Sequence, residues 1–510
     1  MPGDKMAAMS ATTDDAGDRD APDATYDVVV IGAGPVGENV ADRASRTGLS
    51  VAIVEARLVG GSCSYWACMP SKTLLRPAAL VAMAHDVPGV TVDATIDAAA
   101  VFAWRDRVVH GWDDGGQVDW LEGAGLTLLR GRGRLVGERR LTVTAEDGTT
   151  TLVEARHAVV VSTGSAPIVP PVPGLRDAEP WSSEDATASH DVPGSLAVVG
   201  GGVVGVEMAT AYAALGSTVT VLSRGPLLGG AEPWAGEAVA DALRAAGVDV
   251  VIGADLRRAE RRDHGSVAVT YTLDGQERTI EADELLAATG RKPVTDDVGL
   301  ESVGLEPGRP LAVDRQTLVE GVDGDWLYAT GDVTGEVGTT HQGKYQGRVA
   351  GDVIAARFGS GDTDGAPTDG DPVPAPGAEP APWTRYATSA DHAAVPQVVF
   401  TEPQVAWVGL TEQAARDAGR DVRVVAYELA NVAGATVAGE HYGGRAQIVV
   451  DEARRVFVGA TFVGPDAGEM LHAATIAVVG EVPLDRLWHA VPAYPTVSEV
   501  WLRLLETYGL

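Results

Sequence analysis

Apolar and polar residues follow the same order in two stretches of this chain. The first, residues 26–56, has an apolar run at Val28–Ile31, a glycine-rich turn, helical spacing over Val36–Arg46 and a second apolar run at Ser50–Val54. Short apolar runs bounded by turn residues are typical of buried strands, and recurrence every three to four residues is typical of a helix. Residues 196–225 repeat the order of strand, glycine turn, helix and strand. The pattern predicts two βαβ units and therefore two nucleotide-binding domains.

Three other stretches complete the organisation of the chain. Residues 1–24 are polar and acidic and predict a disordered tail. Residues 359–394 are rich in Pro, Gly, Asp and Ala and show no periodicity. Such a segment cannot bury enough apolar surface to order itself, so we expect a disordered insertion or linker. Strand-like and helix-like segments return over residues 395–510, which indicates a third folded region.

Composition narrows the classes of function. The chain has 510 residues, 45% of them hydrophobic, which is enough for about three domains with large cores. Its net charge of -32 argues against nucleic acid and anionic membrane surfaces as partners. No window approaches about 18 consecutive apolar residues, and the N-terminus has no apolar signal region. We therefore expect a cytoplasmic protein.

Both cysteines of the chain, Cys63 and Cys68, lie in the stretch GGSCSYWACMPSK. In a cytoplasmic protein, two close cysteines are more often a catalytic, redox or metal-binding pair than a structural crosslink. Zinc would require further ligands, and none of the residues between the cysteines is a good one, so no metal is expected. A catalytic pair and a redox pair both stay open on this evidence.

The first βαβ unit carries a dinucleotide-binding motif. Gly32, Gly34 and Gly37 form GxGxxG between a strand and a helix, and Glu55 ends the next strand. In this context the glycines permit a tight turn, approach of a pyrophosphate and close helix packing, while the carboxylate accepts hydrogen bonds from a ribose.

The second unit has the same glycines, Gly200, Gly202 and Gly205, but no acidic residue at the ribose position. Ser223 stands there, followed by Arg224. A carboxylate would repel a 2′-phosphate, whereas a small hydroxyl beside a guanidinium can accept one. The pair therefore favours NADPH over NADH.

Seven motifs, in this order along the chain, resemble the pyridine nucleotide-disulfide oxidoreductase family. They are GAGPVG with Glu55, CxxxxC followed by PSK, GGGVVGVE, ATGRKP, ATGDV, VVFTEPQVAWVGLTE and YPTVSE. The resemblance implies an α/β fold with two Rossmann-like dinucleotide-binding domains, for FAD and NAD(P), and a C-terminal α+β dimerisation domain. It implies an FAD-binding domain at 25–170 and 293–358, an NAD(P)-binding domain at 171–292 and a dimerisation domain at 395–510.

The resemblance also implies roles for single residues. Cys68 would lie next to the flavin, and Cys63 would be the outward thiol that attacks a substrate. Lys72 and Glu207 match a pair beside the flavin ring. FAD would be held by Gly32, Gly34, Gly37, Glu55, Thr163, Gly164, Gly331 and Asp332, and the nicotinamide cofactor by Gly200, Gly202, Gly205, Ser223, Arg224 and Gly290. A homodimer is implied, in which each active site is completed by the partner's C-terminal segment.

Two departures from the family pattern bear on the reaction. The family's disulfide reductases have a histidine at the position of Tyr494, paired with the glutamate that is retained here as Glu499. Because a free tyrosine has a pKa near 10, against about 6.5 for histidine, it is a poorer base at neutral pH. The filler between the cysteines, SYWA, is also unusual. Within it we interpret Trp66 as a packing residue, with a platform for an electron acceptor as the alternative.

Together these observations predict an FAD-dependent NAD(P)H oxidoreductase. Electrons would pass through the flavin and the Cys63/Cys68 disulfide to a small-molecule acceptor, either a disulfide or a quinone-like compound. Two alternatives stay open: a soluble pyridine nucleotide transhydrogenase, and the lipoamide dehydrogenase component of a multienzyme complex.

Overall fold

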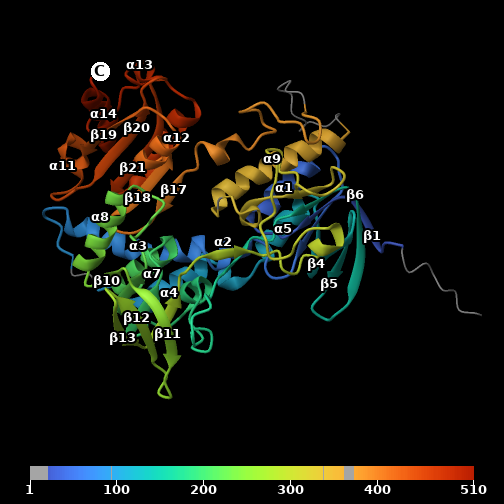
Figure 1. Cartoon of the computed structure of the whole chain (residues 1–510), viewed down its shortest axis with the longest axis horizontal. Coiled ribbons are helices and arrows are strands. Elements are labelled where there is room, and N and C mark those ends of the chain that lie inside the picture. Colours follow the sequence, from blue (N-terminus) through green and yellow to red (C-terminus); the bar gives the residue numbers. More distant parts are fainter. Residues whose placement is uncertain (1–20, 93–94, 337, 361–372) are drawn as a thin grey trace, which may run out of the picture.

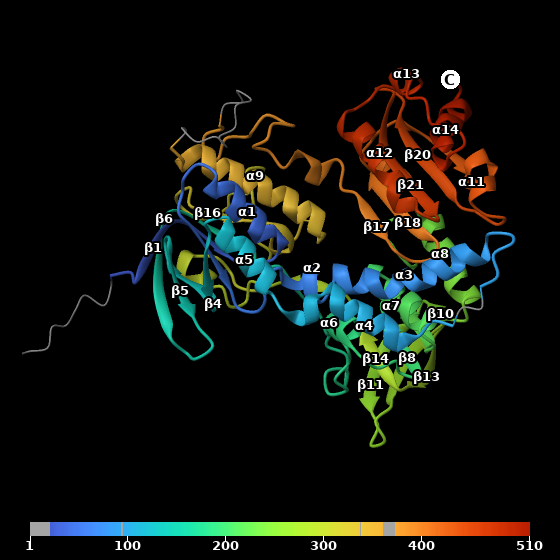
Figure 2. The same ribbon diagram turned by 180° about the vertical axis from the view of Figure 1, so that it is seen from behind.

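The computed structural model describes residues 21–92, 95–336, 338–360 and 373–510. It confirms the predicted fold class, with two α/β domains and a C-terminal domain built on an antiparallel sheet (Figure 1). The view from behind shows the long helix α3 running between the C-terminal domain and the second domain (Figure 2). Most of the predicted disordered tail, residues 1–20, lies outside the described part of the chain. None of the helices within these ranges is long and apolar enough to span a bilayer.

The first domain is built on a seven-stranded sheet in the order β3-β2-β1-β6-β5-β4, with β16 paired to β6. Its strands are β1 (Ala24–Ile31), β2 (Val51–Glu55), β3 (Thr127–Arg130), β4 (Arg132–Gly137), β5 (Arg140–Thr144), β6 (Thr150–Val161) and β16 (Leu327–Ala329). Its helices are α1 (Pro35–Ser45), α2 (Gly61–Tyr65), α3 (Cys68–His85), α4 (Ala98–Val108), η1 (His110–Trp112), α5 (Gly115–Gly123), η2 (Leu300–Val303), η3 (Gly331–Thr334) and α9 (Thr340–Phe358). Because β1, β2, β3, β6 and β16 are parallel, their carboxyl ends share one edge of the sheet.

Helices α1 and α9 pack against each other in parallel over most of their length. Three glycines of α9 make this contact possible. A Cβ added to Gly343 would lie 2.6 Å from Val36 Cγ2, and one added to Gly351 would lie 2.4 Å from Arg43 Cβ. A Cβ at Gly347, between them, would lie 2.7 Å from the Val36 carbonyl oxygen. The close, parallel contact brings both helix N-termini to the carboxyl edge of the sheet.

The second domain contains a parallel sheet in the order β10-β9-β8-β14 and a separate three-stranded antiparallel sheet, β11-β12-β13. Its elements are α6 (Ser183–Ala188), β8 (Ser195–Val199), α7 (Val203–Ala214), β9 (Thr218–Ser223), α8 (Pro233–Ala245), β10 (Asp249–Ile252), β11 (Asp255–Arg261), β12 (Val267–Leu273), β13 (Gln276–Ala282) and β14 (Glu284–Ala287). The chain enters and leaves this domain through two short strands, β7 (Ser165–Pro167) and β15 (Arg291–Pro293), which pair antiparallel. The predicted boundaries at 170/171 and 292/293 fall close to these strands.

The C-terminal domain is a five-stranded antiparallel sheet in the order β17-β18-β21-β20-β19. Its elements are β17 (Gln397–Val399), β18 (Gln404–Gly409), α10 (Glu412–Asp417), β19 (Val422–Glu428), η5 (Leu429–Asn431), α11 (Ala433–Ala438), β20 (Arg445–Asp451), β21 (Val456–Gly464), α12 (Ala467–Val479), α13 (Leu484–Leu487), η6 (Val497–Glu499) and α14 (Val500–Tyr508). One core forms between the sheet and helices α12 and α14, with Phe457, Phe462, Leu471 and Leu504 among its buried residues.

The segment that follows α9 differs in part from the predicted disordered insertion at 359–394. Residues 361–372 lie outside the described part of the chain. The end of the segment, however, forms η4 (Ser389–His392) and packs on α9. Tyr386 is 3% exposed, and Asp391 accepts hydrogen bonds from Gln342 and Gln346 of α9. Average composition does not register such contacts of single residues, and this is why it predicts disorder here.

The carboxyl of Glu38 on α1 generates a prediction about stability. Its Oε1 is buried and has no hydrogen-bond partner among the described residues, and burial raises the pKa of Glu38 to about 7. The folded protein therefore keeps this carboxyl protonated at pH values where the unfolded chain ionises it. Stability is lost as the pH rises from the unfolded pKa, about 4.3, to about 7, and the loss is constant above that.

We expect Glu38→Gln to remove this loss. The variant should match the parent in thermal unfolding near pH 4.5 and exceed it by about 1 to 3 kcal/mol at pH 8. Glu237→Gln, at an exposed position of α8, is the matched control and should change neither value. A stabilisation that is equal at both pH values would contradict the assignment.

Candidate functional site

A pocket of about 400 Å³ lies at the carboxyl edge of the first sheet. It is lined by residues from the glycine turn, from the cysteine stretch and from the ATGDV motif, among them Gly32, Gly34, Glu55, Cys63, Asp332 and Thr340. The motifs that the sequence predicts to hold FAD therefore face one cavity, and that cavity also contains a thiol.

The glycine turn has the geometry that a bound dinucleotide requires. Gly32 has φ +107°, and a Cβ there would lie 2.4 Å from the Ser162 carbonyl oxygen. A Cβ at Gly37 would lie 1.9 Å from the Gly32 carbonyl oxygen, so only glycine permits this approach of helix to strand. Gly34 is the N-cap of α1 and supplies no side-chain cap, which leaves the first N–H groups of the helix available for an anion.

Polar groups around the same pocket suit the rest of the cofactor. Glu55 accepts a hydrogen bond from Ala33 N at 2.8 Å and lies beside the turn. The Ser165 hydroxyl donates to Asp332, and Thr163 donates to the Val294 carbonyl oxygen at 2.6 Å. Gly164 has φ +73° and Gly331 has φ +80°. These residues fit FAD, while the roles of Glu55 at the ribose and of Asp332 at the ribityl chain stay predictions.

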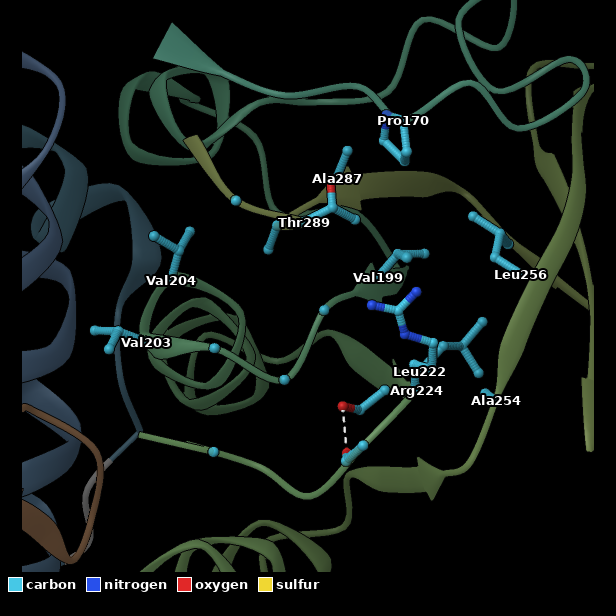
Figure 3. Close-up of a pocket in the computed structure, with 18 of the residues that line it drawn as sticks. Pro170, Val199, Val203, Val204, Leu222, Arg224, Ala254, Leu256, Ala287 and Thr289 are labelled. Carbon is cyan, nitrogen blue, oxygen red and sulfur yellow. Dashed lines mark hydrogen bonds between the residues drawn. The ribbon is translucent and has the colours of Figure 1, made fainter. Parts of the chain in front are cut away.

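A second pocket, of about 690 Å³, lies at the corresponding edge of the second domain's parallel sheet (Figure 3). Gly200 has φ +124°, and its Cβ would lie 2.2 Å from the Ala288 carbonyl oxygen. A Cβ at Gly205 would lie 2.0 Å from the Gly200 carbonyl oxygen, whereas one at Gly202, the N-cap of α7, would meet no atom within 4 Å. Gly290, with φ +119°, lines the opposite wall. The turn repeats the geometry of the first.

Ser223 and Arg224 both line this second pocket. The Ser223 side chain is 4% exposed and donates a hydrogen bond to the Gly225 carbonyl oxygen at 2.7 Å. Arg224 extends into the pocket toward Val199 (Figure 3), and no ion pair or hydrogen bond of its side chain is found among the described residues. The guanidinium is therefore the positive group available to a ligand at this end of the pocket.

The two cysteines lie on consecutive helices. Cys63 is in α2, and Cys68 is the first residue of α3, whose first turn contains Pro70. Proline is tolerated in the first turn because the N–H groups there have no partner within the helix. Both side chains are free thiols in this structure, and each shifts the pKa of the other. The Cys68 Sγ also lies 3.2 Å from the Thr340 Oγ1.

The surroundings shift the pKa values of the two thiols in opposite directions. The pKa of Cys63 is raised, first by its hydrogen bond with Cys68 and then by burial. The pKa of Cys68 is lowered to about 6, first by the hydrogen bond with Cys63, then by Thr340 and Lys72, while burial opposes the change. A thiolate in this pair would therefore reside on Cys68, and a thiolate is the reactive form of cysteine.

Lys72 and Glu207 form a partly buried ion pair beside the cysteines. Lys72 Nζ lies 2.7 Å from Glu207 Oε2, and Glu207 is 3% exposed. The other carboxylate oxygen accepts a hydrogen bond from Phe400 N at 2.9 Å, and the Lys72 ammonium lies 5.0 Å from the centre of the Phe400 ring. The pair joins all three domains, since Lys72 is on α3, Glu207 on α7 and Phe400 next to β17.

Trp66 lies in the wall of the first pocket and is held by a charged neighbour. The Arg57 guanidinium stacks 3.8 Å from the centre of the Trp66 ring and pairs with Glu184 at 3.1 Å. The Trp66 carbonyl oxygen accepts a hydrogen bond from Thr187 at 2.7 Å. These contacts favour the packing interpretation of Trp66 over an acceptor platform.

The C-terminal motif does not bring Tyr494 and Glu499 together within one chain. Tyr494 is 78% exposed. Glu499 is 7% exposed and forms an ion pair with Arg503, while its Oε2 has no hydrogen-bond partner among the described residues. Because Tyr494 is exposed, it is available to a second copy of the chain. Its role in proton transfer stays a prediction.

Two residues of the site were missed from the sequence. Thr340 lies shortly after the ATGDV motif, and its position at the start of α9 brings it to Cys68. Arg291 lines both pockets and donates to Ser165, the residue that bonds Asp332. Arg291 belongs to the ATGRKP motif, but within that motif only Gly290 was expected to bind a cofactor.

Comparison with known proteins assigns most of the chain to one family. Residues 26–347 match the family model described as pyridine nucleotide-disulphide oxidoreductase, and residues 395–504 match the dimerisation domain of the same family. Dihydrolipoyl dehydrogenase of Halobacterium salinarum is 33% identical over 491 residues, covering 94% of this chain and 95% of that protein. Mercuric reductase of Staphylococcus aureus is 30% identical over 94% of this chain and 81% of its own length.

Solved structures show the same fold. LpdA from Mycobacterium tuberculosis superposes with a TM-score of 0.79 at 25% identity, covering 95% of this chain and all of that one, 100%. The HOCl-induced flavoprotein disulfide reductase RclA from Escherichia coli superposes with a TM-score of 0.77 at 24% identity, covering 94% of this chain and 99% of its own.

Two substitutions in the second glycine turn should separate an effect on stability from an effect on cofactor binding. Gly205→Ala should destabilise the protein by about 1 to 3 kcal/mol, because its Cβ would lie 2.0 Å from the Gly200 carbonyl oxygen. Gly202→Ala should leave thermal unfolding within about 0.5 kcal/mol of the parent but weaken nicotinamide cofactor binding about tenfold or more, since a methyl there obstructs the pyrophosphate. Thermal melts and cofactor titrations check both, and equal destabilisation by the two variants would count against the account.

Proposed function

We propose, from the premise that the chain belongs to the pyridine nucleotide-disulphide oxidoreductase family, that it carries electrons from NADPH through FAD and the Cys63/Cys68 pair to a small-molecule acceptor. Proteins of this family are FAD-dependent oxidoreductases, and the match to their dimerisation domain supports a homodimer. The observation that carries the proposal is the shared pocket: Cys63 lines the cavity formed by the glycine turn, Glu55 and Asp332. We place the enzyme in the cytoplasm.

Bound FAD would supply a group that takes a hydride from the nicotinamide and passes two electrons on. The chain's own residues divide the remaining tasks. Lys72, fixed by Glu207 at 2.7 Å, places a positive charge beside Cys68. Cys68, at the start of α3, is the thiol whose charged form the site favours. Cys63, with its raised pKa, keeps its proton until a substrate arrives.

With a disulfide substrate, the thiol steps balance as follows. Cys63 loses its proton and attacks one substrate sulfur, which forms a mixed disulfide and releases the other substrate sulfur as a thiolate. The Cys68 thiolate then attacks Cys63, which restores the Cys63–Cys68 disulfide and releases the second thiolate. Each leaving thiolate takes up a proton, one of them the proton lost by Cys63 and the other from solvent. In this chain the group that moves those protons would be Tyr494, supplied by a second copy.

The finer identity of the acceptor is open to two readings. A disulfide acceptor is supported by the two thiols and by the curated relatives, several of which are dihydrolipoyl dehydrogenases. A quinone-like acceptor is supported by Tyr494, since direct reduction from the flavin needs no base at that position. An anaerobic NADPH titration, followed by turnover with oxidised lipoamide, small disulfides, quinones and thio-NAD, separates these readings and the transhydrogenase alternative.

The coenzyme choice is tested at Arg224. We expect NADPH to reduce the enzyme at a lower concentration than NADH, and Arg224→Glu to erase or reverse the difference, because a carboxylate repels the 2′-phosphate. Arg278→Glu makes the same charge change at an exposed site of β13 and should leave the preference unchanged. A parent enzyme that prefers NADH by about tenfold, or about 1.4 kcal/mol, would overturn the assignment.

The role of Tyr494 in proton transfer is tested by placing the family's histidine at this position. If tyrosine is a poor base, Tyr494→His should raise the rate of disulfide reduction at pH 7 by about tenfold or more while changing quinone reduction little. The measurement is kcat for both acceptors in the same preparation. A parent that reduces a small disulfide rapidly and loses this activity in Tyr494→His would instead make Tyr494 a catalytic group.

A further inference from the structure

Among the described residues, Cys68 has one side-chain neighbour outside the cysteine stretch within hydrogen-bond reach, and the proposed function gives it no role. The Thr340 Oγ1 lies 3.2 Å from the Cys68 Sγ, and Thr340 lines the same pocket as Cys63. A neutral thiol can donate or accept in such a contact. A thiolate has no proton, so in the charged state the Thr340 hydroxyl must be the donor.

The contact joins the N-termini of two long helices. Cys68 is the first residue of α3, which has 18 residues, and Thr340 is the first residue of α9, which has 19. Neither helix has a side-chain cap at this end. Helix N-termini carry partial positive charge and unpaired N–H groups, so both favour a negative charge placed between them. The parallel contact between α1 and α9 fixes Thr340 in this place.

The charged groups around the two cysteines also favour a negative charge on Cys68. On α3, Lys72 lowers the pKa of Cys68, and its own partner is Glu207 of α7. On α9, Lys344 lowers the pKa of Cys63, but this effect is outweighed by the hydrogen bond with Cys68 and by burial. On α2, Cys63 itself is the titratable neighbour of Cys68.

We propose that Thr340 is a positioning residue of the redox pair, whose hydroxyl selects Cys68 over Cys63 as the sulfur that carries the negative charge after reduction. The step balances when the disulfide takes up two electrons and one proton: the S–S bond breaks, Cys63 becomes a thiol and Cys68 a thiolate. The hydroxyl of Thr340 donates to that thiolate. This inference rests on the proposed function for its purpose, but the ionisation of Cys68 can be measured without turnover.

The neighbouring residue provides a matched control. Thr339 is the N-cap of α9, and its hydroxyl is buried without a hydrogen-bond partner among the described residues. Thr339→Val and Thr340→Val therefore remove the same group at adjacent positions of one helix end. Only the second removes a donor from Cys68. Thr340→Ser keeps the donor and should behave as the parent.

The experiment uses FAD-loaded enzyme in a Cys63→Ser background, in which Cys68 is the one cysteine left in the chain. The pH midpoint of thiolate formation is read from ultraviolet absorbance and from the rate of alkylation by iodoacetamide. We expect Thr340→Val to raise the midpoint by about one pH unit, a tenfold loss of thiolate at a pH below the midpoint. Thr339→Val and Thr340→Ser should shift it by less than about a third of that.

The outcomes separate this inference from the proposed function. An unchanged midpoint in Thr340→Val, or an equal shift in Thr339→Val, would overturn the role of Thr340. If Thr340→Val does not fold, Thr340→Ala removes the same donor and takes its place. Failure to bind FAD or to accept electrons from NADPH would overturn the proposed function instead, and the midpoint of Cys68 would then be measured in the protein without FAD.

Discussion

The close parallel contact between α1 and α9 is the constraint on which the rest of the site depends. It requires three positions of α9 without a side chain, Gly343, Gly347 and Gly351, because a Cβ at any of them would enter α1. The contact places the N-terminus of α1 at the glycine turn and the N-terminus of α9 at Cys68. A dinucleotide pyrophosphate and a thiolate are both negative, and a helix N-terminus favours a negative charge. The contact therefore provides one helix N-terminus for each of them. One packing arrangement therefore serves two parts of the chemistry.

The second constraint is the joint between domains. Lys72, Glu207 and Phe400 come from three different domains and meet through one ion pair and one backbone hydrogen bond. Breaking the pair would leave a carboxylate that is 3% exposed without its cation, which is costly in a buried setting. The strands β7 and β15 add a second joint, in which Arg291 reaches Ser165 beside Asp332. The orientation of the two cofactor pockets is therefore tied to the residues that surround the sulfurs.

The sequence was most informative where local rules decide the structure. Both βαβ units, the glycines with positive φ and the position of Glu55 follow from apolar periodicity and from the space that a dinucleotide needs. The sequence was least informative where contacts join distant segments. Thr340 lies 272 residues from Cys68, and no local pattern predicts their hydrogen bond. Tyr386 and Asp391 belong to a segment whose composition predicts disorder, yet Tyr386 is buried and Asp391 accepts a hydrogen bond from α9.

The central claim, that Cys63 and Cys68 carry electrons as a disulfide and a dithiol, is tested most directly by counting thiols. The oxidised enzyme is unfolded and alkylated before and after addition of one equivalent of NADPH without oxygen, and the modified cysteines are counted by mass spectrometry. The account predicts no alkylated cysteine before NADPH and two per chain afterwards. Two free thiols in an oxidised enzyme that turns over, or a disulfide that survives reduction of the flavin and turnover of the acceptor, would contradict it.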